Sequence, residues 1–396
     1  MFKQLFLKDL KPGMVLTQPL VSPTGRLVVE AGTLLTEFII GSFQNPVYMK
    51  EILPEGVGFD EMQLNVFVAE QHGALSAEDV SNVGAEPSDE GDDLIPDPNR
   101  EHLLDPYYVA LYDNVMEILT KLLDPRNINR GLDLDAIGQL IADRQLEQLC
   151  DGARAVTQIH NMNREGSYLL HHSLHVAILA GLMGRWLHWP RDYRERLVLA
   201  GLLHDVGKLK ISDDILNKPG KLTTAEMDIV RRHSAYSAEI LAKCGLSGEA
   251  DIMAGVLQHH ERGDGSGYPS GIKKDIISPF GKILAILDIY DAMAANRSYA
   301  HKVSPFEIFD RLNADMMEDK IDAEYGVLFV KKVCHALTGS WLRLTSGEKA
   351  KIVYIDQSRT NSLPIVETTE GKFYDLAHDG RVKIVELLTL SEAMGA

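Results

Sequence analysis

The residues best suited to chemistry are histidines and aspartates on segments that are otherwise apolar and patterned as helices. His204 and Asp205 open the sequence HDVGK, and the same region carries further candidates, namely His172, His233, His259, His260 and Asp288. Buried imidazoles and carboxylates cost free energy unless they are paired or bind a metal. So many of them on core-forming segments between residues 172 and 288 predict a metal cluster.

The types of side chain indicate which metals the cluster would hold. Imidazole nitrogens and carboxylate oxygens without thiolates favour two divalent transition metal ions, Fe or Mn first, with Ni, Zn or Co as further candidates. His204 and Asp205 are predicted to be consecutive on a helix, and Asp205 has two oxygens that can bridge a metal pair. Two ions about 3.5–4 Å apart would share a bridging hydroxide that attacks phosphorus. This is the chemistry of phosphodiester hydrolysis.

Further residues extend the predicted cluster. Lys208 lies four positions after His204, so on a helix it would share a face with His204 and direct a cation beside the metals. His259 and His260 are adjacent, so a helix end must present both. Asp288 has no basic neighbour in sequence, which favours a metal partner. His171, His175 and His188 are interpreted as ordinary core or surface histidines.

The surrounding patterns predict a mainly α protein in three parts. Residues 1–72 alternate turn signals, such as Pro12-Gly13 and Thr24-Gly25, with short apolar runs, which predicts a small β-rich domain. Residues 73–105 carry ten acidic residues and are interpreted as a disordered linker. Residues 106–396 are predicted to form the third part. It shows helical periodicity to about residue 340, and the runs AKIVYID, LPIVET and VKIVELL after about residue 345 predict a few strands.

Local signals place two helix ends and one loop. Thr223 to Glu226 form a capping box that opens the predicted helix TAEMDIVRRHSAYSAEILAKC, and Gly245 is expected to end it. Between His260 and Pro279 the chain is rich in glycine and is expected to be irregular.

Bulk properties exclude several classes of function. A net charge of -17 argues against a nucleic-acid polymer as a partner, because such binding needs a basic footprint. The three cysteines form no close pair, which suits a reducing compartment. No secretion signal and no apolar run of about 18 residues is seen, so we expect a cytoplasmic protein without a membrane span.

Five segments together resemble the HD-GYP subgroup of the HD metal-dependent phosphohydrolases over residues 165 to 340. They are HSLHVAIL, LLHDVGKLKISDDILNKPGKLT, HSAYSAEIL, HHERGDGSGYP and LAILDIYDAM. The resemblance implies an all-α HD-type domain that hydrolyses cyclic di-GMP to the linear dinucleotide pGpG and, in some members, to GMP.

The resemblance also assigns roles to individual residues. It implies that one metal is held by His172, His204, Asp205 and Asp288, and that the other is held by Asp205, His233, His259 and His260. Asp205 then bridges the ions, and Lys208 contacts the phosphate and stabilises the transition state. The substrate-side residues implied in the same way are Arg262, Tyr268 and Arg297.

Three positions depart from the subgroup's pattern. Tyr168 stands where some members have a glutamate for a third metal, and Glu165 is badly spaced to replace it, so two metals are expected. Gly263 replaces a usual tryptophan and Ala300 a usual basic residue. These departures leave two alternatives open, which are an inactive cyclic di-GMP receptor or scaffold and a phosphohydrolase for another nucleotide. A homodimer, a signalling partner and a regulatory or interaction role for residues 1–72 are also left open.

Overall fold

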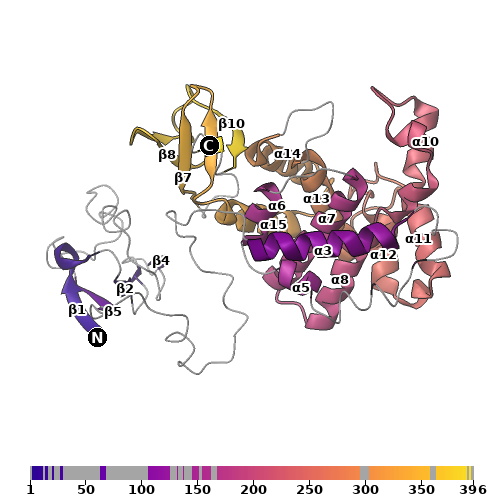
Figure 1. Ribbon diagram of the computed structural model, residues 1–396, viewed down its shortest axis with the longest axis horizontal. Helices are drawn as coiled ribbons and strands as arrows, with labels where there is room; N and C mark the ends of the chain where they lie inside the picture. The colour runs from indigo at the N-terminus through magenta and orange to yellow at the C-terminus, as the bar shows by residue number, and fades with distance from the viewer. Residues whose placement is uncertain are drawn as a thin grey trace. The chain divides into compact units, whose positions relative to one another are not determined.

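The computed structural model divides the chain into two compact units, residues 1–95 and 96–396 (Figure 1). It describes residues 2–11, 14–16, 20–21, 27–29, 63–67, 106–124, 132, 137, 145–150, 154–161, 167–294, 303–356, 363–389 and 392–393. No helix within these ranges is long and apolar enough to cross a bilayer.

Most of the described residues of the first unit are in strands. β1 (Phe2–Phe6), β5 (Gln63–Phe67) and β2 (Val15–Leu16) form an antiparallel sheet in the order β1-β5-β2, while β3 (Leu20–Val21) pairs with β4 (Leu27–Val29). A short 3₁₀ helix, η1 (Leu7–Asp9), follows β1. These strands agree with the β-rich prediction, and the bounds of the predicted domain at residues 1–72 stay a prediction. The predicted turns at Pro12-Gly13 and Thr24-Gly25 and the linker at 73–105 lie outside the described residues.

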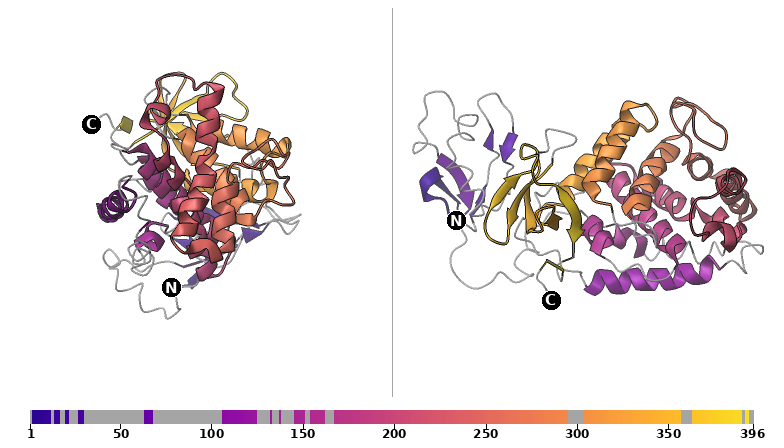
Figure 2. Two further views of the ribbon diagram at one scale, coloured as in Figure 1. Left: turned by 90° about the vertical axis from the view of Figure 1, so that its right-hand side faces the viewer. Right: turned by 90° about the horizontal axis from the view of Figure 1, so that it is seen from above.

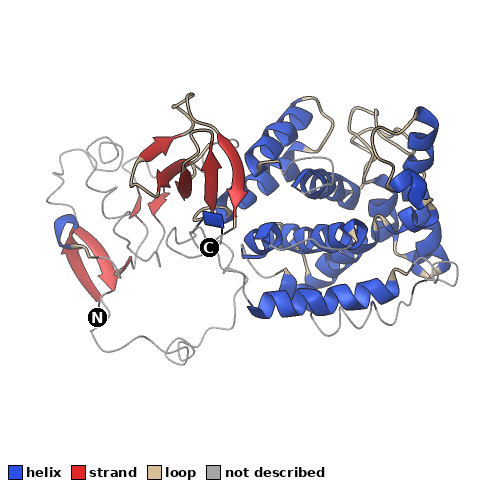
Figure 3. Ribbon diagram, turned by 45° about the horizontal axis from the view of Figure 1, so that its top comes forward, coloured by secondary structure: helices blue, strands red, loops and turns tan. Residues whose placement is uncertain are grey.

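The second unit is a helical body followed by a small sheet, which confirms the mainly α prediction (Figure 3). Its helices are α3 (Pro106–Leu122), α5 (Gln145–Leu149), α6 (Arg154–Asn161), α7 (Tyr168–Trp186), α8 (Arg191–Leu203), η5 (Val206–Lys210), α9 (Asp213–Leu216), α10 (Thr224–Arg231), α11 (His233–Lys243), η6 (Leu246–Gly248), α12 (Ala250–Gln258), α13 (Pro279–Ala294), α14 (Pro305–Met317) and α15 (Ala323–Ala336).

Two helices that are apolar on nearly every side form the centre of this body. α7 buries almost all of its residues from Leu170 to Trp186, and α13 buries most of its residues from Phe280 to Ala294. A helix that is apolar all round must be covered by other elements. α7 packs against α8 and α13, and α12 packs against α8, α11 and α13. The polar residues that α7 and α13 carry are therefore held in the core.

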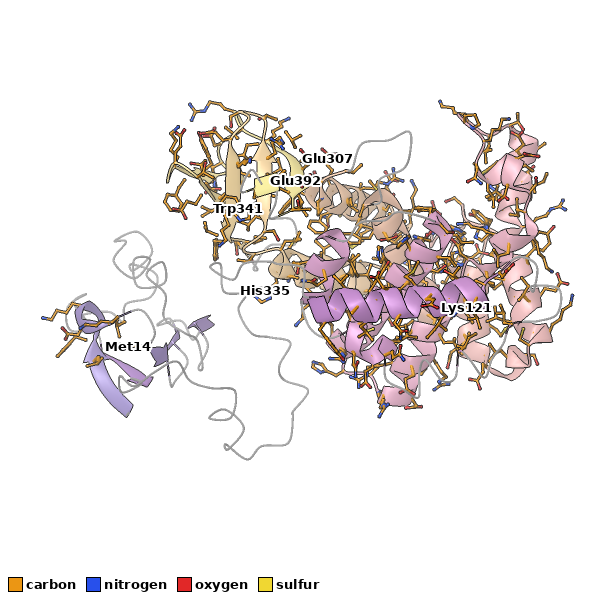
Figure 4. The ribbon with its side chains drawn as sticks, viewed as in Figure 1. Met14, Lys121, Glu307, His335, Trp341 and Glu392 are labelled. Carbon is orange, nitrogen blue, oxygen red and sulfur yellow. The ribbon has the colours of Figure 1, made fainter. Side chains whose placement is uncertain are left out.

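The C-terminal strands form one antiparallel sheet in the order β10-β6-β7-β8-β9. The strands are β6 (Trp341–Leu344), β7 (Lys349–Tyr354), β8 (Ile365–Thr368), β9 (Phe373–Asp375) and β10 (Ile384–Leu388). Trp341, at the start of β6, is labelled in Figure 4. Alternate residues such as Leu342, Ala350 and Val366 are buried in the same hydrophobic cluster as the helices. The strands predicted from the terminal apolar runs are confirmed.

The predicted helix after Thr223 is two helices. The capping box between Thr223 and Glu226 is present, and Gly245 follows the second helix with a φ of 89°. The chain breaks at Arg232, however, between α10 and α11. The carbonyl of Val230 accepts a hydrogen bond from the ring of His233 at 2.6 Å. The side chain of a prospective metal ligand thus contacts the backbone at the break.

The chain leaves the helical path at the HD pair. α8 ends at Leu203 with His204 as its C-cap, and Asp205 precedes the 3₁₀ helix η5. The prediction that both residues lie on one regular helix is therefore wrong. Ser237 of α11 fixes the bend, because its hydroxyl donates to the His204 carbonyl and accepts from the Gly207 amide, both at 2.8 Å.

We predict that Gly207→Ala destabilises the protein by about 1–3 kcal/mol, the usual cost of overpacking a core. A Cβ at this position would lie 2.0 Å from the His233 carbonyl oxygen and 2.5 Å from the Ser237 amide. Urea unfolding followed by tryptophan fluorescence measures the change. Gly248→Ala is the matched control, since its Cβ would meet nothing within 4 Å. Equal stability of the two variants would contradict the close approach of η5 to α11.

Candidate metal centre

Backbone hydrogen bonds orient three of the predicted ligands. His204, His233 and His259 hydrogen-bond through Nδ1 to the carbonyl oxygens of Gly201, Val230 and Val256, at 2.7, 2.6 and 2.7 Å. Each acceptor lies three residues earlier, at or near a helix end. A carbonyl accepts only from a protonated nitrogen, so Nδ1 carries the hydrogen and Nε2 is left with its lone pair. This is the usual way in which proteins fix the tautomer of a metal-binding histidine.

The carboxylate of Asp205 lies between two sets of imidazoles. Its Oδ1 is 3.2 Å from Nε2 of His233 and 4.0 Å from Nε2 of His259. Its Oδ2 is 3.5 Å from Nε2 of His204 and 3.6 Å from Nε2 of His172. The two oxygens of one side chain therefore face two different groups of nitrogens.

Two groups of side chains could each hold a metal ion. Within each group, the prospective ligand atoms lie within 4.8 Å of one another. The groups are His172, His204 and Asp288, and Asp205, His233, His259 and His260. The structure thus brings together all seven residues that the sequence singled out, from α7, α13 and the ends of α8, α11 and α12.

Two buried polar atoms support the fit of a cation. His204 Nε2 and Asp205 Oδ1 are buried, and neither has a hydrogen-bond partner among the described residues. Buried polar atoms without partners are rare, because the lost interaction with water is not replaced. A lone pair on nitrogen and a carboxylate oxygen are both donors that divalent transition metals accept. The residues present fit such an ion.

The electrostatics of the site keep most of the imidazoles neutral. Burial lowers the pKa of His204, His233 and His259, and it lowers the pKa of His260 to about 3. Metal binding requires deprotonated ligands, so a low pKa prepares these rings. His172 differs. Burial lowers its pKa, but hydrogen bonds to Asp288 and Asp291 outweigh burial and raise it.

The two aspartates remain charged in spite of their burial. Burial raises the pKa of Asp205, but the Lys208 ammonium and the nearby imidazoles hold it well below its usual range. Asp288 is held low in the same way, chiefly by its hydrogen bond to His172. The centre therefore presents anionic oxygens among imidazoles that are mostly neutral, which suits a divalent cation.

Lys208 contacts Asp205 directly. It lies on η5, whose three-residue turn places its ammonium against Oδ2 of Asp205, the residue three positions earlier. The prediction that Lys208 shares a helical face with His204 is therefore replaced by an i, i+3 contact with Asp205. The Lys208 side chain is 22% exposed while that of Asp205 is fully buried. The cation thus lies between the carboxylate and solvent.

The loop from His260 to Pro279 folds back on the end of α12. Glu261 accepts hydrogen bonds from the Ser270 and Ile272 amides at 2.7 and 3.1 Å, and the ring of Tyr268 stacks on His260 at 4.6 Å. A Cβ at Gly267 would meet the Arg262 amide at 2.3 Å, so only glycine fits there. Sequence reasoning missed Glu261, although a glutamate between the histidine pair and a glycine-rich loop was a signal.

Arg262 and Arg297 are the other predicted substrate-side residues. The Arg262 guanidinium donates to the carbonyls of His259 and Glu261 at 3.3 and 2.9 Å, so here it holds the backbone. Arg297, Ala300 and Glu165 lie outside the described residues. Gly263 leaves no room for a tryptophan, since its Cβ would lie 2.3 Å from the Asp319 carbonyl oxygen.

Several residues that contact the predicted ligands or their neighbours were not identified from the sequence. Asp291 is buried and bonds both His172 and His175. The hydroxyl of Tyr112, on α3, bonds both His171 and His175 at 2.8 Å. His171 and His175 are satisfied core histidines, as interpreted from the sequence. Tyr168 stacks on the His172 ring at 5.5 Å.

Comparison with known proteins gives the class of this domain. Residues 144–325 match the family model of the HD domain. The chain is 36% identical over 193 residues to the cyclic di-GMP phosphodiesterase PA4108 of Pseudomonas aeruginosa. The matched residues cover 49% of this chain and 46% of PA4108. It is 42% identical over 138 residues to the 3'3'-cGAMP-specific phosphodiesterase 3 of Vibrio cholerae, 35% of this chain and 30% of that protein.

A solved structure covers more of the chain. The HDG"Y"P protein Bd1817 from Bdellovibrio bacteriovorus aligns with 83% of this chain and 98% of its own, with a TM-score of 0.44 and 14% identity. The chain spans less than half the length of the two curated relatives. Residues 144–325 thus match an HD domain, and the predicted resemblance of the chain to the HD-GYP subgroup is confirmed.

We predict that Asp205→Ala lowers the metal content of the purified protein from about two ions to fewer than one per chain. The variant removes the fully buried carboxylate whose two oxygens each face one group of nitrogens. Elemental analysis by mass spectrometry measures the ions. His378→Ala is the control, because this exposed histidine pairs with Asp375 in the C-terminal sheet region. Wild-type metal content in Asp205→Ala would refute the position of Asp205 at the centre.

Proposed function

We propose that the protein is a metal-dependent phosphodiesterase that hydrolyses cyclic di-GMP to the linear dinucleotide pGpG. The observation that carries the proposal is the buried Asp205 carboxylate, whose two oxygens face two groups of imidazoles. Two cations held on either side of Asp205 would suit in-line displacement at phosphorus, where both the attacking and the leaving oxygen need stabilisation.

The distances support the ligand sets that the resemblance implies. His172, His204, Asp205 and Asp288 would hold one ion, and Asp205, His233, His259 and His260 the other. Fe or Mn is the expected metal, because nitrogen and carboxylate ligands without thiolates suit these ions. When bound, divalent ions at this site supply Lewis acidity and lower the pKa of water. The protein's part is to fix the ligand directions through the helix ends and to exclude solvent from Asp205 and His204, which are fully buried.

Lys208 is proposed as the catalytic cation on the substrate side. Its ammonium stays protonated, since burial lowers its pKa but Asp205 and Asp288 outweigh burial and raise it. It is the partly exposed neighbour of a fully buried carboxylate. A fixed ammonium there can donate to a phosphoryl oxygen as negative charge develops on it. Arg262, Tyr268 and Arg297 remain the proposed contacts to the rest of the nucleotide.

The choice of a cyclic dinucleotide comes from the relatives. PA4108 is named a cyclic di-GMP phosphodiesterase, and the Vibrio cholerae relative is named specific for 3'3'-cGAMP. Both names support hydrolysis of a cyclic dinucleotide, and the second gives a specific reason to test another base. Cyclic di-GMP is proposed first because the GYP loop, Gly267 to Pro269, matches the HD-GYP subgroup, and the resemblance to this subgroup implies cyclic di-GMP as the substrate.

The test is a turnover assay with the anaerobically purified chain loaded with Mn(II) or Fe(II). Cyclic di-GMP, 3'3'-cGAMP and cyclic di-AMP are each incubated with it, and chromatography separates the linear dinucleotide from mononucleotides. Conversion of cyclic di-GMP to pGpG at the highest kcat/KM supports the proposal, and later GMP shows a second cut. Preference for 3'3'-cGAMP would change the substrate. Metal-loaded protein that binds but does not cut any of them would be a receptor.

We predict that Lys208→Ala keeps both metals and lowers kcat about 100-fold, the usual loss for one preorganised charge contact. Lys210→Ala is the control, because Lys210 lies on the same 3₁₀ helix but pairs with Glu239 of α11 and lies over the Tyr236 ring. Steady-state kinetics with a parallel metal count separates the two effects. A kcat within twofold of wild type in Lys208→Ala would remove its assigned role.

A further inference from the structure

A buried chain of hydrogen bonds links α3 to the metal centre. On α3, the Tyr112 hydroxyl lies 2.8 Å from Nε2 of His175 and 2.8 Å from Nδ1 of His171. His175 Nδ1 is 3.0 Å from Oδ1 of Asp291, and Oδ2 of Asp291 is 2.8 Å from Nδ1 of His172. All five side chains are buried. We call Tyr112, His175, Asp291 and His172 the relay.

The chemistry of these groups gives the relay one direction. A carboxylate only accepts hydrogen bonds, so His172 and His175 both donate to Asp291 from Nδ1. A neutral imidazole that donates at one nitrogen accepts at the other, so His175 Nε2 accepts the Tyr112 hydroxyl hydrogen. The hydroxyl oxygen then accepts from Nδ1 of His171. Each of these bonds then pairs one donor with one acceptor, and Nδ1 of His172 is committed to Asp291. Nε2 of His172 is the atom left for a metal, and without a metal it hydrogen-bonds Asp288.

The second ring nitrogen of His172, Nε2, is directed at the centre. It lies 3.1 Å from Oδ1 of Asp288 and 3.6 Å from Oδ2 of Asp205. His204, His233 and His259 have their Nδ1 hydrogens held by backbone carbonyls, whereas His172, in the middle of α7, uses the Asp291 side chain. A side-chain partner must itself be held in place, and His175 and Tyr112 perform that role for Asp291.

We propose that Tyr112, acting through His175 and Asp291, is a positioning residue that sets the orientation and tautomer of His172 and thereby the metal affinity of the centre. The inference rests on the ligand assignment in the proposed function. If this is so, metal affinity depends on how α3 packs against the helical body, although no residue of α3 belongs to the two metal-ligand groups.

α3 packs on the core of the helical body through one face. α3 lies along the outside of the helical body (Figures 1 and 2). It buries one stripe, which includes Tyr108, Tyr112, Val115 and Leu119, while Lys121 near its end is 73% exposed (Figure 4). In sequence it directly follows the acidic segment 73–105. A shift of α3 would reach His172 through the Tyr112 hydroxyl.

The experiment compares metal affinity in single-atom variants of the full chain. Tyr112→Phe removes the hydroxyl and keeps the ring. Tyr108→Phe is the matched control, since Tyr108 lies one turn earlier on the same buried stripe and its hydroxyl donates to the Leu149 carbonyl at 3.2 Å. Asp291→Asn removes one acceptor from the middle of the relay. Each protein is titrated with Co(II) in competition with a chelator, and its visible absorption spectrum reports the ligand geometry.

We expect Asp291→Asn to weaken Co(II) binding about 10- to 100-fold, the usual effect of losing an outer-shell partner. Tyr112→Phe should weaken it about tenfold and change the spectrum, while Tyr108→Phe should match the wild type even if its melting temperature falls equally. Co(II) affinity of Tyr112→Phe within twofold of Tyr108→Phe would overturn the role of Tyr112.

Failure of the proposed function would look different. If the wild type binds Co(II) but cuts no cyclic dinucleotide, the proposed activity is wrong, and the affinities of the variants still decide the relay. If the wild type binds no Co(II), Mn(II) or Fe(II), the role of the relay is overturned together with the ligand assignment.

Discussion

The helical body is organised around the burial of one negative charge. Asp205 is fully buried, and an isolated buried carboxylate would cost several kcal/mol. The Lys208 ammonium offsets part of that cost on one side, and four imidazole nitrogens lie within 4.0 Å of the carboxylate, where a bound cation would offset the rest. Those nitrogens come from four different helices or helix ends, so the helices must converge at this point. The packing of the apolar helices therefore also sets the positions of the prospective ligands.

Helix ends perform most of the positioning. The last turn of a helix leaves carbonyl groups without backbone partners, and histidine rings can bond them. His204 and His259 use this property at the ends of α8 and α12, and His233 bonds α10 from the start of α11. Each bond stabilises the chain locally and directs a lone pair into the site. His172 is in the middle of a helix, where backbone carbonyls are already used, which is why it depends on Asp291.

The sequence predicted the composition of the site well and its local geometry poorly. Residue type and order identified the seven prospective ligands, and hydrophobic periodicity predicted the helices and terminal strands. The bend after Leu203 was missed, because it depends on Ser237, which lies far along the chain. The break at Arg232 was missed since the periodicity continues across it. Tyr112 could not be linked to the site, because its partners come from tertiary packing and the Tyr112 position reads as an ordinary core aromatic.

The most direct test of the account is anomalous X-ray diffraction from crystals of the Mn(II)- or Fe(II)-loaded protein. The account predicts two anomalous peaks, one beside each oxygen of Asp205. One should be ligated by His172, His204 and Asp288, and the other by His233, His259 and His260. A loaded protein with a single peak remote from Asp205, or with two peaks that share no oxygen of Asp205, would contradict it.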